Sequence, residues 1–129
     1  MTVPNSLAGF DVPAAVERML GSSSLWWQAV DLFARHFAGW ETEWRTSIDD
    51  RTREVRCVHA LGSGAANIGA VRLSVSARAL EVALRRHAGD GNETELLGLR
   101  DELRRVFRET LAELAEALDV SARELGNGP

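Results

Sequence analysis

Apolar residues recur at steps of three and four along nearly all of this 129-residue chain. In a helix of 3.6 residues per turn, that spacing places the apolar side chains on one face. No segment shows the strict alternation of apolar and polar residues that is typical of a half-buried strand. The pattern therefore predicts an all-α protein.

The spacing separates into four long helical segments and one short one. The expected segments are Ser22–Ile48, Val55–Ile68, Leu73–Leu84 and Leu96–Leu118, with Val12–Leu20 ahead of them. Ser22 and Asp50 are candidate N-caps, and Gly69 is a candidate terminator. The connections are short, so neighbouring helices should be antiparallel. We predict an antiparallel up-down four-helix bundle with a short extra N-terminal helix.

Within this bundle, residues 1–10 are expected to form an N-terminal arm, residues 11–125 the bundle and residues 126–129 a flexible tail. Val12, Val16, Met19 and Leu20 are expected to close one end. Trp26, Trp40 and Trp44 fit the apolar face, whereas Trp27 lies off it and is expected to be exposed.

Composition narrows the function classes. The net charge is −4, with 15 basic residues that are all arginine, so tracking of a nucleic-acid backbone is disfavoured. A single cysteine, Cys57, excludes an internal disulfide and a multi-cysteine zinc site. No apolar run is long enough to span a membrane, and no secretory signal is visible. These features predict a cytoplasmic protein without membrane insertion.

The most informative stretch surrounds His59. It lies in the second long segment, which carries Gly62 and Gly64 although each interior glycine costs about 1 kcal/mol relative to alanine. Helical spacing places Arg56, Ser63 and Ala66 on the side of His59, with Gly62 slightly offset. His59 should therefore stand over small side chains, whereas Gly64 faces away and should serve tight packing.

Such a histidine is suited to phosphoryl chemistry with an outside partner. A neutral imidazole has one ring nitrogen with a free lone pair near pH 7, which can attack phosphorus. No acidic cluster accompanies His59, because the nearest carboxylate, Glu54, points elsewhere on the helix. The chain is thus expected to carry a phosphoryl group without being a kinase on its own. Cys57 diverges from His59 by about 200° on a helix and cannot form a dyad with it.

Residues 59–70 read HALGSGAANIGA and resemble the signature of histidine phosphotransfer (HPt) domains, roughly His-x-Leu-Lys-Gly-x-Ala-x-Asn-Ile-Gly-Ala. The resemblance extends to residues 9–12 before the short helix and to Leu80-Glu81 after the signature. It implies a helical bundle in which His59 accepts a phosphoryl group from a receiver domain of a response regulator or hybrid sensor kinase. It also implies that magnesium comes from the receiver and that the chain holds no cofactor or metal.

Two positions depart from the family pattern. Gly62 stands where the family usually has lysine, and Ser63 stands where it usually has glycine. The family's lysine is thought to stabilise charge near the phosphohistidine. Arg56 is a candidate substitute, since i−3 lies on the same side of a helix as i+4. The expected docking residues are therefore Arg56, Gly62, Ser63 and Ala66.

Two functions from different classes remain open. In the first, His59 relays phosphoryl groups between receiver aspartates. In the second, the bundle is a degenerate interaction module that binds a receiver or kinase and carries no phosphate, as the changes at Gly62 and Ser63 would allow. His36 and His87 are expected to be structural. The chemical competence of His59 separates the two functions.

Overall fold

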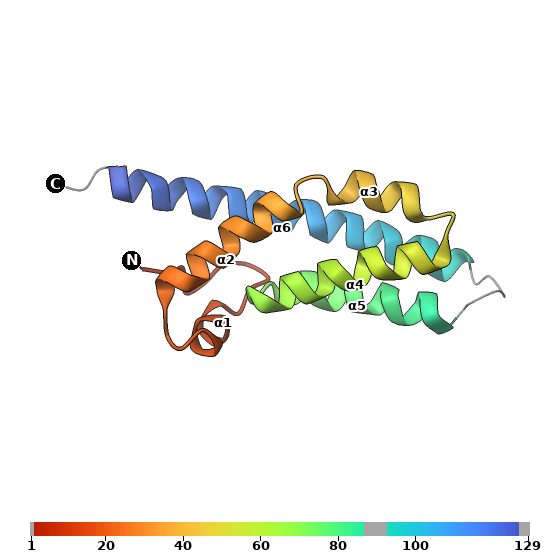
Figure 1. Ribbon diagram of the computed structural model, residues 1–129, viewed down its shortest axis with the longest axis horizontal. Coiled ribbons are helices and arrows are strands. Elements are labelled where there is room, and N and C mark those ends of the chain that lie inside the picture. The colour runs from red at the N-terminus through yellow and green to blue at the C-terminus, as the bar shows by residue number, and fades with distance from the viewer. Residues whose placement is uncertain (1, 87–92, 127–129) are drawn as a thin grey trace.

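The computed structural model describes residues 2–86 and 93–126, and every regular element in this part of the chain is a helix. The helices are α1 (Val12–Arg18), α2 (Ser23–His36), α3 (Trp40–Ser47), α4 (Arg51–Asn67), α5 (Val71–Arg86) and α6 (Glu93–Gly126). The segment α2–α3 runs in one direction, and α4, α5 and α6 then alternate in direction (Figure 1). The predicted all-α, up-down bundle with an added N-terminal helix is confirmed.

Side-chain caps start the helices where the sequence indicates. Ser22 Oγ accepts from the backbone N–H of Leu25 at 3.1 Å at the start of α2. The Asp50 carboxylate does the same for Arg53 at 3.2 Å at the start of α4. Each cap satisfies one of the N–H groups that have no partner within the helix. The side-chain caps therefore fix where α2 and α4 begin.

The predicted long helix from Ser22 to Ile48 is wrong, because the chain breaks it into α2 and α3. The last turn closes at Phe37, and Gly39 becomes the N-cap of α3. Trp40 stacks on Trp44 within α3, with 4.9 Å between ring centroids, and lies 5.0 Å from Phe107 of α6. The buried aromatic residues that suggested one helix therefore reach the core from two helices.

The core contains Trp26, Trp40 and Trp44, as expected. Trp27 is half-buried rather than exposed, because its indole N–H donates to the backbone oxygen of Thr2 at 3.0 Å. The expectation for Leu20 is also wrong. Its side chain is 95% exposed on a backbone with φ of 58°, past the end of α1.

A buried ion pair joins three helices. The Glu54 carboxylate accepts from Arg100 Nη2 at 2.7 Å and from Arg100 Nε at 2.8 Å. It also accepts from the indole N–H of Trp44 at 3.0 Å. Glu54 is fully buried on α4, Trp44 lies on α3 and Arg100 on α6. This arrangement keeps Glu54 away from His59, as the sequence predicts.

Two of the segments predicted from the sequence lie at least partly outside the described residues. The loop His87–Asn92, which includes His87, lies wholly outside it, as do residues 127–129 of the expected tail. The helix α6 itself ends at Gly126.

Candidate functional site

The turn between α4 and α5 fixes how these two helices face each other. Gly69 has φ of +80°, and a Cβ there would lie 2.6 Å from the backbone oxygen of Asp11. The Asp11 N–H donates to Gly69 O at 2.8 Å, and the Trp26 indole N–H donates to Ile68 O at 2.9 Å. Glycine alone adopts this conformation without strain and allows the close approach. The α4–α5 hairpin is therefore held against α1 and α2.

In this antiparallel hairpin, residues equally far from Ala70 along the chain face one another. His59 lies eleven residues before Ala70 and Glu81 eleven residues after it. Gly62 and Arg78 form a second such pair, and Ala66 and Ser74 a third. These six residues, with Ser63 and Val75, line a shallow depression of about 230 Å³. The hairpin thus brings the predicted Gly62, Ser63 and Ala66 together with His59.

Glu81 holds the His59 ring. Nδ1 lies 3.0 Å from Glu81 Oε1 and 3.1 Å from Oε2. Arg85, one turn further along α5, donates from Nε to Glu81 Oε2 at 3.0 Å. Burial raises the pKa of the Glu81 carboxyl, but the hydrogen bonds from His59 and Arg85 outweigh it, so that pKa lies below its usual range. Glu81 is therefore a carboxylate at neutral pH.

The charge state of Glu81 assigns the tautomer of His59. An ionised carboxylate has no proton to donate, so the Nδ1 that contacts it carries the hydrogen. In the neutral ring the lone pair then belongs to Nε2. The His59 side chain is 60% exposed, whereas that of Glu81 is 14% exposed. The site therefore presents a nucleophilic nitrogen to solvent on a ring whose other nitrogen is anchored.

The structure does not bring Arg56 to this depression. Arg56 lines a separate one, together with Trp40 and Cys57, on the side of α4 that faces α3. At 100° per residue, Arg56 lies about 60° from His59 in one direction and Gly62 about 60° in the other. The two residues therefore flank His59, and only Gly62 turns towards α5.

Sequence reasoning missed the contribution of α5 to the site. Glu81 entered only as part of the family resemblance, and Arg78, Ser74 and Val75 were not singled out. The available signal was the glycine turn: once α4 and α5 are taken as a hairpin about Ala70, Glu81 and Arg78 fall opposite His59 and Gly62. Helical spacing within α4 cannot supply that information, because it concerns one helix at a time.

The other candidate residues have different surroundings. His36 is exposed at the end of α2, with its ring edge-on to Phe37 at 4.7 Å. Cys57 is half-buried, and burial raises the pKa of its thiol. Among the described residues, no group of three or more His, Cys, Asp or Glu side chains is placed to hold a metal ion. No helix described here is long and apolar enough to cross a membrane.

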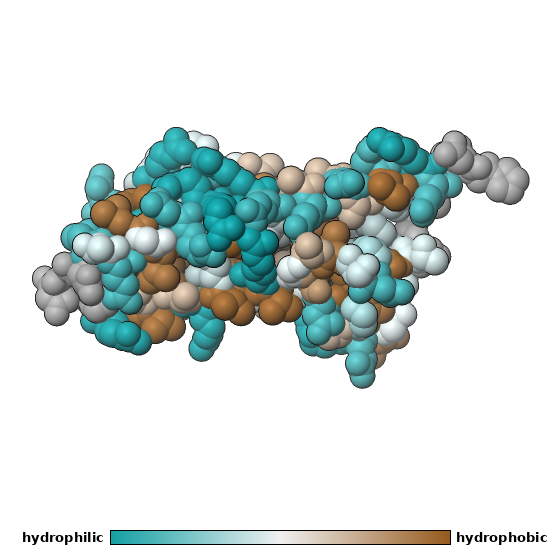
Figure 2. Space-filling model, turned by 180° about the vertical axis from the view of Figure 1, so that it is seen from behind, coloured by the Kyte–Doolittle hydropathy of each residue, from teal (hydrophilic) through white to brown (hydrophobic). Residues whose placement is uncertain are grey.

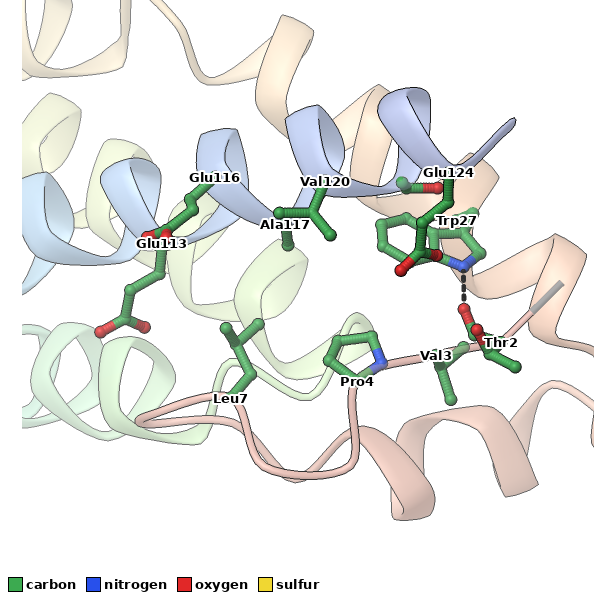
Figure 3. A pocket seen from close by; sticks show the side chains of 11 residues that line it. Thr2, Val3, Pro4, Leu7, Trp27, Glu113, Glu116, Ala117, Val120 and Glu124 are labelled. Carbon is green, nitrogen blue, oxygen red and sulfur yellow. Dashed lines mark hydrogen bonds between the residues drawn. The ribbon is translucent and has the colours of Figure 1, made fainter. Parts of the chain in front are cut away.

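A second depression, of about 260 Å³, lies between the N-terminal arm and the far half of α6 (Figure 3). Leu7 and Pro4 face Ala117 and Val120 across it, and Trp27 lies at one end. It shares no lining residue with the depression at His59. The chemistry-bearing groups of the hairpin therefore do not extend into it.

The structure is a small helical bundle with an exposed histidine on α4 whose Nδ1 is anchored by Glu81. Residues 25–109, about two thirds of the chain, match the family model described as Hpt domain. The chain belongs to the Hpt domain family. Neither a curated protein nor a solved structure shows a significant match.

Membership in this family supports a phosphotransfer role in two-component signalling. Domains of this family interact with receiver domains and kinases in phosphorelays. The identification of the HPt family from residues 59–70 is thereby confirmed.

Proposed function

We propose that His59 carries a phosphoryl group between the aspartates of receiver domains. The observation that carries this proposal is the anchored ring: Nδ1 is bound to Glu81, on a side chain that is 60% exposed. A pre-oriented nucleophile lowers the entropic cost of an in-line attack. We place this relay in the cytoplasm, with its receivers.

The transfer uses Nε2 of His59 as the nucleophile and the carboxylate of the receiver's aspartate as the leaving group. The Nε2 lone pair of His59 attacks the phosphorus of a receiver's aspartyl phosphate, the N–P bond forms, and the P–O bond to the aspartate breaks. The aspartate leaves as a carboxylate, and the ring, which keeps its Nδ1 hydrogen, gains positive charge. Glu81 stabilises this charge, as a carboxylate beside a histidine does in other catalytic groups. A second receiver's aspartate reverses the step.

The receiver is proposed to dock over the hairpin. Gly62, Ser63 and Ala66 keep the surface beside His59 low, and exposed apolar residues continue along α5. Val75 and Val82 are 61% and 42% exposed, and hydrophobic side chains gather along the lower edge in the rear view, where α5 lies (Figure 2). Arg56 would lie at the α3 edge of the docked surface. Magnesium for the transfer is proposed to be held by the receiver.

The changes at Gly62 and Ser63 support one alternative, a bundle that binds a receiver or kinase and carries no phosphate. The two functions differ in one measurable property, the competence of His59. A bound partner is compatible with both, so binding data alone do not separate them.

The deciding experiment treats the purified protein with phosphoramidate and follows intact mass and the site of labelling. We expect one acid-labile phosphoryl group on His59, absent from His59→Gln and retained in His36→Gln, which removes an exposed histidine elsewhere. A known phosphotransfer domain serves as the positive control. Absence of label from the folded protein, with the control labelled, would exclude the relay and leave the binding module.

A further inference from the structure

A phosphoryl group on His59 would create a charge problem at this site. It would bring about −1.5 to −2 charges to a position beside Glu81, which is itself a carboxylate. Arg85 offsets the charge of Glu81, to which it is hydrogen-bonded. With the positive charge of the phosphorylated ring also counted, a net negative charge of about 0.5 to 1 remains at the site, so a further cation would stabilise the phosphohistidine. Gly62 supplies none.

Arg78 is the cation among the residues that line the His59 depression. It is exposed on α5, one turn before Glu81, and forms no ion pair or hydrogen bond within the described residues. Its guanidinium group is thus free to bind a new anion. Arginine suits this task because its N–H groups match the oxygens of a phosphoryl group in pairs.

Gly62 leaves the space that Arg78 would use. The two residues face each other across the hairpin, eight residues on either side of Ala70. A Cβ at Gly62 would lie 3.4 Å from the Cβ of Ala77, so the two helices are close at this level. With no side chain on α4 there, an arginine on α5 meets no obstacle between its own helix and His59.

We propose that Arg78 forms the binding site for the phosphoryl oxygens of phospho-His59, so that the cation comes from α5 and not from α4. This inference rests on the proposed function of His59. Arg78 would stabilise the charge both during transfer and in the phosphorylated protein. It would therefore speed phosphorylation and slow the loss of phosphate by hydrolysis.

The test measures both rates with phosphoramidate, a small donor that needs no docked receiver. For an exposed cation we expect Arg78→Ala to slow labelling about two- to fivefold and to shorten the lifetime of the phosphohistidine. Arg86→Ala removes an exposed arginine of α5 that does not line this depression, and it should label at the original rate. Circular dichroism and thermal unfolding verify the fold of each variant.

A relocated cation gives a second, positive test. Gly62→Lys in the Arg78→Ala background places an ammonium group on the opposite wall, where a Cβ makes only ordinary contacts. We expect it to recover most of the labelling rate and lifetime. Original kinetics in Arg78→Ala, or an equal loss in Arg86→Ala, would overturn the inference. Absence of label from the unaltered protein would instead overturn the proposed function of His59.

Discussion

At the scale of single residues, the contact between Glu81 and His59 determines which ring nitrogen reacts. We expect the unaltered protein to form only the isomer phosphorylated on Nε2, because Nδ1 donates its hydrogen to a carboxylate. Glu81→Ala should slow labelling about two- to fivefold, as for loss of an exposed ion pair, and should produce both isomers. Phosphorus NMR of the labelled protein distinguishes them.

Glu81→Gln is the matched control for this prediction. Its amide oxygen still accepts from Nδ1, so the Nε2 isomer should persist although the charge is gone. If Glu81→Ala also gave a single isomer, the ring would be oriented by something other than this contact.

Single residues also show how much of the site could be predicted from the sequence. The 3.6-residue period places Ser63 and Ala66 on the side of His59, and the structure agrees. It places Arg56 there too, although the packing of α3 and α5 on opposite sides of α4 separates Arg56 from the depression. Arg78 enters from another helix. Which residues meet across helices depends on packing, which a local period does not encode.

At the scale of a helix, replacing either of the two interior glycines of α4 by alanine should change the stability of the fold in opposite directions. A Cβ at Gly64 would lie 2.8 Å from the Phe37 ring, which is buried, whereas one at Gly62 would lie 3.4 Å from its nearest neighbour. We expect Gly64→Ala to destabilise the fold by about 1–2 kcal/mol through overpacking. Gly62→Ala should stabilise it by up to about 1 kcal/mol through helix propensity.

Urea unfolding of the two variants measures both changes in one host helix. Equal and positive shifts in stability would show that Phe37 moves aside freely and that Gly64 has no packing role.

The break between α2 and α3 is the element that sequence reasoning missed. Phe33, Phe37, Trp40 and Trp44 keep the helical spacing across it, and all four are buried. A period-based prediction therefore continues through the break. The signal that remained was Gly39, an exposed glycine between two aromatic residues, which becomes the N-cap of α3. Trp40, the first residue of α3, packs against Phe107 far along the chain, a contact that local spacing does not reveal.

An ion pair between α3 and α6 makes part of the stability depend on pH. The Glu41 carboxylate accepts from Arg108 Nη2 at 2.6 Å and from Nε at 2.8 Å, and these hydrogen bonds lower the pKa of Glu41. A folded-state pKa below the unfolded one gives stability that is present above about pH 4.3 and is lost as the pH falls through the folded value.

We therefore expect the midpoint of urea unfolding to decrease below about pH 4.3 and Glu41→Gln to decrease less steeply there. At pH 7 the variant should be the less stable protein. Equal slopes for both proteins across the acid range would show that Glu41 is not linked to folding.

At the scale of the whole molecule, the Glu54–Arg100 pair holds α3, α4 and α6 together inside the bundle. Arg100→Met leaves a fully buried carboxylate whose remaining hydrogen bond comes from Trp44, and should cost about 3–5 kcal/mol. The double variant Glu54→Leu, Arg100→Met should recover much of that loss, because no charge then stays buried. Chemical denaturation measures each value.

Arg105→Met is the control, since it removes an arginine that is paired on the surface of α6. Its unfolding midpoint should stay close to that of the unaltered protein. A small loss in Arg100→Met, comparable to this control, would contradict a buried role for the pair.

The buried pair has a further consequence, for the response of the protein to heat. Hydration of charged groups becomes less favourable as temperature rises, so the cost of keeping Glu54 and Arg100 away from water decreases on warming. The pair should therefore contribute more to holding α3, α4 and α6 together at high temperature than in the cold.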